Sequence, residues 1–154
     1  MLLMSAYPTS QTNQFEVNIM RTSPTPSELA MFDDLTPIER FDYATIRMAE
    51  CEDVWSIGSD EGFAIEEKEG KPYIVVWPYQ QLAQNYCVDE HEDKQPLTIS
   101  LEMFVYNLLM QCQEEGIAIQ IFPQPSNEGR WISAVDLFSY MEGLMESGEY
   151  YMEG

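Results

Sequence analysis

The sequence of 154 residues predicts a single α+β domain, in which an antiparallel meander plus one further strand packs with four or five helices. Paired helix-start motifs, apolar runs of strand length and a hydrophobic content of 45% support this prediction, because they supply both element types and one sizeable core. We assign residues 1–23 to an N-terminal arm or tail, residues 24–147 to the domain and residues 148–154 to a C-terminal tail. Within the arm, residues 15–19 alternate apolar and polar, which fits a short strand.

The first two helices begin at repeated Thr-Pro-x-Glu motifs, at Thr25 and at Thr36. Each Thr can cap free amides, the Glu can reach back to the cap, and Pro at the first helical position loses no hydrogen bond. The second helix is predicted to run to about Cys51. Its buried face is predicted to hold Ile38, Phe41, Ala44 and Met48, with Arg40 elsewhere.

Residues 54–57, 63–65 and 73–77 form the predicted meander, with turns at residues 59–62 and 68–71. The third strand is apolar on both faces, which indicates a central strand covered on both sides or an interface. Pro78 is predicted to end it and to begin a short helix that carries Tyr79, Leu82, Ala83 and Tyr86 on one face.

The second half of the domain is predicted to start with an acidic loop over residues 87–97. Ser100 then caps the most regular helix, which carries Leu108 and Cys112 on its apolar stripe and ends at Gly116. Residues 117–121 form the last predicted strand, and residues 124–129 form a loop. A final helix follows Ser133, with a buried stripe of Leu137, Phe138, Met141, Leu144 and Met145.

Five segments, taken in order, resemble a bacterial family known as domain of unknown function 2750. They lie at residues 52–57, 60–64, 75–78, 99–104 and 119–123, and the likeness covers roughly residues 36–145. The Trp77-Pro78 and Phe122-Pro123 pairs that end strands carry most of the likeness. Members often have a Trp in the acidic loop after the Trp-Pro helix, and this sequence has none there. The resemblance implies an α+β fold and no particular activity.

The charge of the chain limits its partners. There are 27 Asp and Glu against 7 Lys and Arg, a formal net charge of −20. Nucleic-acid binding needs clustered Lys and Arg to neutralise phosphates, and anionic membranes repel such a chain. We therefore expect no nucleic-acid partner and no membrane partner. A strongly negative surface keeps a protein soluble, and it also steers cationic partners towards it.

The sequence offers no recognisable catalytic constellation. Its single histidine, His91, excludes a His-based triad or a His-rich metal centre within one chain. Cys51, Cys87 and Cys112 have neither disulfide-framework nor zinc spacing. We therefore predict no catalytic residue, no metal and no cofactor. The absence of a signal peptide and of a long apolar run predicts a cytoplasmic protein.

Our first functional interpretation is a protein-binding module for a basic partner, as immunity proteins against cationic nucleases and DNA mimics are. Two exposed acidic segments between predicted elements are the candidates for its binding face. The candidate residues are Asp60 and Glu61 in the first turn and Asp89, Glu90, Glu92 and Asp93 in the acidic loop.

The alternative is a small enzyme or ligand-binding protein with an aromatic cleft flanked by carboxylates. Trp77 and Tyr79 are its first candidates, since Trp77 precedes a corner where a side chain is expected to be half exposed. The other aromatic candidates are Trp55, Tyr73, Tyr86 and Trp131. A continuous acidic face favours the first interpretation, and a closed aromatic cavity with a perturbed carboxylate favours the second. Tyr150, Tyr151 and Met152 could dock on the domain, seal a homodimer or recognise a partner.

Overall fold

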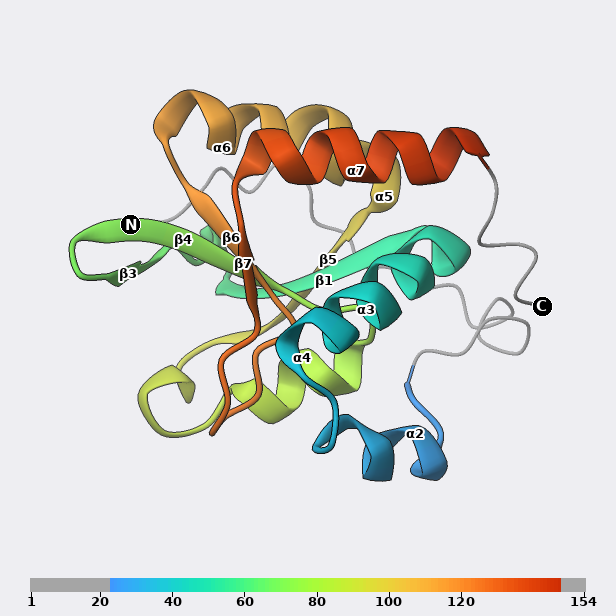
Figure 1. The fold of residues 1–154 in the computed structure, drawn as a ribbon. Helices are drawn as coiled ribbons and strands as arrows, with labels where there is room; N and C mark the ends of the chain where they lie inside the picture. The colour runs from blue at the N-terminus through green and yellow to red at the C-terminus, as the bar shows by residue number, and fades with distance from the viewer. Residues whose placement is uncertain (1–22, 148–154) are drawn as a thin grey trace.

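The computed structural model describes residues 23–147 (Figure 1). The strand expected at residues 15–19 and the aromatic tail at residues 150–152 lie outside the described residues. The predicted α+β class is confirmed: helices surround two small sheets, and one contiguous apolar core joins them.

The helices begin where local capping chemistry places them. Both Thr-Pro-x-Glu motifs form complete capping boxes, since Thr25 and Thr36 accept from the Glu amides at 3.2 Å and the Glu side chains accept in return. The α-helices are α2 (Pro26–Phe32), α3 (Pro37–Cys51), α4 (Gln80–Tyr86), α5 (Leu101–Met103), α6 (Leu109–Glu115) and α7 (Ala134–Ser147). A 3₁₀ turn, η1 (Asp89–His91), and a π-helical segment, η2 (Phe104–Leu108), complete the set.

Within residues 23–147, seven strands form two sheets. The first sheet has the order β2-β1-β5 and is antiparallel, and the second is mixed, with the order β3-β4-β6-β7. The strands are β1 (Asp53–Ser59), β2 (Gly62–Phe63), β3 (Glu66–Lys68), β4 (Lys71–Val76), β5 (Gln95–Ser100), β6 (Ala118–Ile121) and β7 (Arg130–Ile132). Backbone hydrogen bonds of 2.8 and 2.9 Å between Trp55 and Trp77 connect the two sheets.

The predicted meander is divided between these sheets. β2 pairs with β1, whereas β3 pairs with β4, so the chain changes sheets between Phe63 and Glu66. The further strand β6 lies parallel to β4, which is a central strand with Ile74, Val75 and Val76 fully buried. In Figure 1, α6 and α7 lie side by side across one side of the sheets, and α4 lies on the other.

The face predicted for α3 is partly wrong. Ile38 is 58% exposed, whereas Arg40 is 2% exposed. The guanidinium of Arg40 can be buried because its nitrogens donate to three carbonyls, those of Leu35 at 2.7 Å, Glu128 at 2.6 Å and Phe122 at 3.2 Å. Phe41, Ala44 and Met48 are buried as predicted.

The predicted helix over residues 101–115 is present but is not a regular α-helix. Ser100 caps it, with its Oγ 3.2 Å from the Met103 amide, and Gly116 ends it at a φ of 70°. Between these ends the π-helical η2 widens one turn. Leu108 and Cys112 are fully buried, which confirms the predicted apolar stripe. In α7, Leu137 and Met141 are buried, and Phe138, Leu144 and Met145 are half-buried against the core.

Three predictions of irregular or helical structure need correction. The expected loop over residues 87–97 contains η1 and the start of β5, which pairs with β1 from Gly58↔Gln95 to Asp53↔Ser100. β7 follows the loop at residues 124–129 and pairs with β6. The sequence did not predict this strand, because its three residues are too few to show a strand pattern. The helix after Pro78 starts at Gln80, with Tyr79 as its N-cap residue in an extended conformation.

Candidate functional site

Residues 123–129, here called the proline loop, separate two open cavities. The loop is held by Arg40, by the Trp77 indole donating to the Pro123 carbonyl at 2.9 Å, and by Gln124 donating to Asp33 at 3.0 Å. Phe122, just before the loop, has a φ of 57°, a left-handed conformation that a bulky residue rarely adopts. Such strain persists where surrounding contacts enforce it and is frequent at binding sites.

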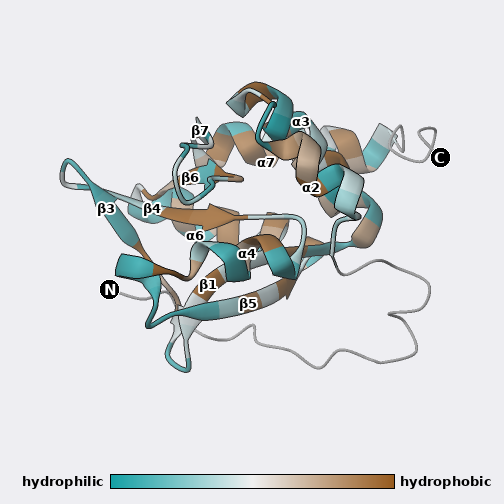
Figure 2. Cartoon of the chain, turned by 90° about the horizontal axis from the view of Figure 1, so that it is seen from below, coloured by the Kyte–Doolittle hydropathy of each residue, from teal (hydrophilic) through white to brown (hydrophobic). Residues whose placement is uncertain are grey.

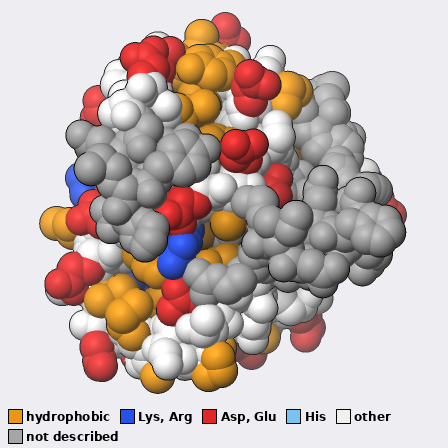
Figure 3. Space-filling view, turned by 90° about the vertical axis from the view of Figure 1, so that its right-hand side faces the viewer, with side chains coloured by type: hydrophobic (Ala, Val, Ile, Leu, Met, Phe, Trp, Pro, Cys, Tyr) orange, Lys and Arg blue, Asp and Glu red, His pale blue; other side chains and the backbone are white. Residues whose placement is uncertain are grey.

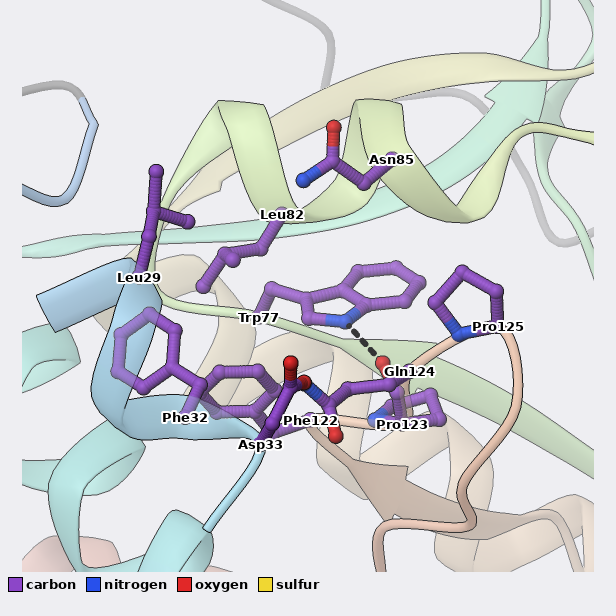
Figure 4. Close-up of a pocket in the computed structure, with 10 residues that line it drawn as sticks. All are labelled: Leu29, Phe32, Asp33, Trp77, Leu82, Asn85, Phe122, Pro123, Gln124 and Pro125. Carbon is purple, nitrogen blue, oxygen red and sulfur yellow. Dashed lines mark hydrogen bonds between the residues drawn. The ribbon is translucent and has the colours of Figure 1, made fainter. Parts of the chain in front are cut away.

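The first cavity, the Trp77 pocket, has a volume of about 280 Å³ and lies between α2, α4 and the proline loop (Figure 4). Its apolar lining includes Leu29, Phe32, Trp77, Leu82 and Phe122, and its polar lining includes Asp33, Asn85 and Gln124. Trp77 forms the floor and is 0% exposed. The expectation that Trp77 is half exposed is therefore wrong, because the β4–α4 corner is covered by the proline loop.

The second cavity, the Trp131 pocket, has a volume of about 320 Å³ and is also lined by the proline loop, from Pro123 to Glu128. Its aromatic walls are Tyr73 from β4, Trp131 from β7 and Tyr86 from the end of α4. Tyr73 and Trp131 meet edge to face, with ring centroids 4.7 Å apart. The ring centroids of Tyr86 and Trp77 lie 5.0 Å apart, so these two packed rings connect the walls of the two pockets.

Sheet register explains why these side chains meet. Gln120 pairs with Val75 on one side and with Trp131 on the other, and Tyr73 lies two residues before Val75. Side chains two apart on a strand share a face, so Tyr73, Gln120 and Trp131 line one face of the second sheet. Glu66 pairs with Tyr73 and Lys68 with Lys71, which places β3 side chains on the same face.

Gln120 is 3% exposed and lies at the floor of the Trp131 pocket. Its Oε1 accepts from the Gly129 amide at 2.8 Å, which fixes the orientation of the carboxamide. Its Nε2 has no hydrogen-bond partner among residues 23–147. The hydroxyls of Tyr73 and Tyr86 likewise have no hydrogen-bond partner among residues 23–147. The pocket therefore presents the Gln120 amide donor and two hydroxyls to any occupant.

A cation already stands at the rim of this pocket. Lys68 donates to the Glu128 carboxylate, and its Nζ lies 5.5 Å from the centroid of the Trp131 ring. The side chains of Lys68 and Glu128 are about half exposed, at 51% and 53%. The hydrogen bond from Lys68 lowers the pKa of Glu128.

His91 connects the pocket to the acidic loop. Its ring stacks on Tyr86 at 4.6 Å, and its Nε2 lies 3.5 Å from Glu66 Oε1. His91 is 8% exposed, so its side chain is buried although the acids on both sides of it are exposed. Burial raises the pKa values of Tyr73 and Tyr86, and nearby negative charge, including Glu66, Glu90 and Glu128, raises both further.

The predicted acidic binding residues come together at one end of the molecule. The pairing of Gly58 with Gln95 places the β1–β2 turn, with Asp60 and Glu61, beside the segment before β5. The contacts of Glu66 with His91 and Lys94 add the β3–β4 hairpin. We call residues 60–61, 66–69 and 89–93 the acidic end, whose β3–β4 hairpin lies at the left of Figure 2. Its candidate residues Asp60, Glu61, Asp89, Glu90, Glu92 and Asp93 are all exposed.

Acidic side chains are not confined to this end. Asp and Glu outnumber Lys and Arg on the face drawn in Figure 3 as well, and exposed acids lie on α3, α6 and α7. Much of the scarce positive charge has internal partners. Arg47 pairs with Glu28 and Glu50, and Arg130 lies 4.8 Å over the Phe41 ring. The carboxylate excess therefore remains at the surface.

The two aromatic candidates named first are core residues. Tyr79 is 1% exposed and Trp77 forms a pocket floor, whereas Tyr73, Tyr86 and Trp131 line the second pocket together. Gln120 was not predicted from the sequence, because a polar residue in an alternating strand indicates a solvated face. Lys68 and Glu128 lie in a predicted turn and a predicted loop, where charged residues are ordinary. The sequence feature that could have revealed Gln120 is its position as a single polar residue between Ile119 and Ile121.

Two further observations concern residues 23–147. No group of three or more His, Cys, Asp and Glu side chains in this range is arranged to hold a metal ion. Of the helices in the same range, none has the length and apolarity to cross a membrane.

The family model described as Protein of unknown function (DUF2750) matches residues 41–140, more than half of the chain. The chain therefore belongs to this family, which confirms the resemblance given by the ordered motifs. The match includes the acidic end and most of both pockets. No curated protein and no solved structure matches the chain.

Proposed function

We propose that this member of the DUF2750 family is a protein-binding module whose acidic end associates with a basic protein partner. Immunity proteins against cationic nucleases and DNA mimics work in this way. The observation that carries the proposal is the convergence of three acidic segments at one end of the fold. Residues 60–94 contain nine Asp or Glu against three Lys. A dense negative field of this kind accelerates association with cationic surfaces.

The alternative, an enzyme or ligand-binding protein with a carboxylate-flanked aromatic cleft, has less support. Both cavities are small and open to the surface, near the lower end of the range of about 300–1,000 Å³ for ligand pockets. Hydrogen bonds from Lys94 and Lys68 lower the pKa values of Asp93 and Glu128. A lowered pKa suits a fixed negative charge, whereas a general acid at neutral pH needs a raised one.

Association kinetics test the proposal. The immobilised chain is used to capture proteins from an extract of its source cells at low salt, and the captured protein is purified. We expect it to be rich in Lys and Arg. Its association rate, measured by stopped flow, should fall steeply with salt, because the Debye length shrinks from about 30 Å at 0.01 M to about 8 Å at 0.15 M.

A pair of charge-matched variants locates the contact. The first combines Asp89→Asn, Glu90→Gln, Glu92→Gln and Asp93→Asn. The control combines Glu102→Gln, Glu114→Gln, Glu115→Gln and Glu146→Gln, all exposed on other elements. Because steering acts on the encounter, the first variant should lower the association rate by about tenfold or more and change the dissociation rate less. A rate that ignores both salt and the first variant would leave solubility as the better explanation of the charge.

We also propose that the protein is cytoplasmic. That it forms a homodimer stays a prediction. The location is supported by Cys51, Cys87 and Cys112, which form no disulfide in the structure. For a homodimer, Met103, Tyr106 and Met110 present exposed apolar surface on α5, η2 and α6. Equilibrium sedimentation of the full chain would test the homodimer.

A further inference from the structure

We infer that the Trp131 pocket binds a Lys or Arg side chain of a peptide segment, whose backbone carbonyl accepts a hydrogen bond from Gln120. This inference rests on the proposed function, because it names the part of the basic partner that the site takes. The site consists of one cavity, three aromatic side chains and the amide donor of Gln120.

The aromatic walls and the rim already hold a cation. Lys68 lies over the Trp131 ring and pairs with Glu128. Trp131 and Glu128 together therefore already hold an ammonium group. The Lys68–Glu128 pair is half exposed, and such pairs contribute little to stability. A partner cation can therefore take the place of Lys68 over Trp131 at small cost.

The electrostatic surroundings select a cation over an anion. Glu128 lines the pocket, and the negative charges of Glu66, Glu90 and Glu128 act on the Tyr73 hydroxyl at its wall. A carboxylate or phosphate would meet these charges, whereas an ammonium or guanidinium is attracted by them and by the faces of aromatic rings. The hydroxyls of Tyr73 and Tyr86 are available to accept hydrogen bonds from the bound cation.

The floor of the pocket offers a hydrogen-bond donor as well. Gln120 Nε2 is a donor on a side chain that is 3% exposed, and it has no partner within residues 23–147. An occupant that supplies an oxygen to this donor gains a hydrogen bond at the pocket floor. Ammonium and guanidinium groups contain donors only. A peptide supplies both the cation and the carbonyl oxygen, which a free amine does not.

Short peptides test this site directly. We use acetyl-Gly-Arg-Gly-amide and acetyl-Gly-Lys-Gly-amide, with acetyl-Gly-Gln-Gly-amide as the neutral control and guanidinium as the cation without a carbonyl. Nuclear magnetic resonance of the ¹⁵N-labelled full chain reports the Gln120 carboxamide and the Trp131 indole. The basic peptides should shift both signals saturably. Guanidinium should shift Trp131 alone, and the neutral peptide should shift neither.

A gain of affinity separates binding from damage to the fold. Lys68→Met removes the internal cation from Trp131, and Lys71→Met removes the same charge from the same hairpin without touching the pocket. Lys68→Met should bind the basic peptides about two- to fivefold more tightly than Lys71→Met, the fold-change that corresponds to one exposed cation–π contact. Gln120→Leu should abolish the preference for the peptide over guanidinium.

The outcomes distinguish the two proposals. Equal peptide affinities for Lys68→Met and Lys71→Met, or equal shifts from the neutral peptide, would overturn the pocket assignment. If a basic protein still associates in a salt-dependent way, the proposed function survives that result. Conversely, peptide binding at the pocket without any basic protein partner would leave the pocket assignment intact and contradict the proposed function.

Discussion

At the scale of single residues, Arg40 shows how a charged side chain can organise the site from inside. A buried guanidinium is costly unless its donors find acceptors. Arg40 meets this condition with carbonyls that lie before α3, just after β6 and in the proline loop. It therefore links α3 to the loop that separates the two pockets. Gly129, next to Glu128, closes the same loop against Gln120.

Gly129 is a position where the backbone approaches too closely for any side chain. A Cβ there would lie 2.1 Å from the Ile121 carbonyl oxygen and 2.8 Å from Phe122 and Pro123 backbone atoms. We expect Gly129→Ala to lower the free energy of unfolding by about 1–3 kcal/mol or more, as overpacking does. Gly143→Ala is the control, because its Cβ meets nothing within 4 Å and alanine favours the helix by roughly 0.5–1 kcal/mol. Urea titrations of both variants check this, and an equally stable Gly129→Ala would contradict the close approach.

At the scale of elements, the segment from Leu101 to Glu115 shows that an apolar stripe survives a change of helix type. The π-helical turn at Phe104–Leu108 shifts the register, yet Phe104, Leu108 and Cys112 all remain buried. Such widened turns are accommodated by packing and are rare without it. α6 then packs beside α7 and leads into β6, so the segment joins α7 to the second sheet.

Leu108 is the natural probe of that packing. It is 0% exposed, and Leu108→Ala should lower the free energy of unfolding by about 2–5 kcal/mol through lost burial and the cavity left behind. Met110→Ala, two residues along and 46% exposed, should change it by less than about 0.5 kcal/mol. Chemical denaturation measures both values. An unchanged midpoint for Leu108→Ala would show that this face is not in the core.

At the scale of the whole molecule, a net charge of −20 coexists with buried thiol and phenol groups that stay neutral. Burial raises the pKa of Cys112 to about 12 and also raises the pKa values of Tyr43 and Tyr86. The folded state thus holds protons that the unfolded chain releases at alkaline pH. The negative charges at the surface repel one another, and salt screens this repulsion.

The sign of this linkage can be measured at Cys112. Its thiol has an ordinary pKa of 9.0, so between about pH 9 and pH 12 the unfolded state loses a proton that the folded state keeps. Stability conferred by the neutral thiol is complete below pH 9 and falls as the pH rises, by up to about 1.4 kcal/mol per pH unit. Cys112→Ala should show a shallower decline in the free energy of unfolding between about pH 8 and pH 11. Parallel slopes for the two proteins would contradict the burial of the thiol.

The overall charge also predicts what the protein does not bind. Duplex DNA should give no complex in a mobility-shift assay at physiological salt, because six to ten phosphate contacts of the usual kind need about as many Lys and Arg on one face. A DNA-binding protein of known affinity serves as the positive control for the assay. A reproducible shift at moderate protein concentration would contradict the preference for basic protein partners.

Much of the secondary structure could be predicted from the sequence because its causes are local. The capping boxes at Thr25 and Thr36, the turn at Gly70 and the helix end at Gly116 each involve residues within one turn of each other. The apolar stripe that includes Leu108 follows the helical period, which a buried face imposes on any amphipathic helix. The two acidic segments were visible for the same reason, since exposed turns tolerate charge.

The tertiary structure decided what the sequence pattern left open. Arg40 is buried because carbonyls from residues more than 80 positions away accept its hydrogen bonds, and no local pattern encodes them. Likewise, Gln120 reads as a solvent-facing residue until the registers of β4 and β7 place Tyr73 and Trp131 beside it. Local patterns fix which face of a segment is apolar, whereas register and long-range hydrogen bonds decide which segments meet. The sequence alone therefore determined the α+β class, the helix ends and the acidity, and only the folded chain assembled the acidic end and the Trp131 pocket.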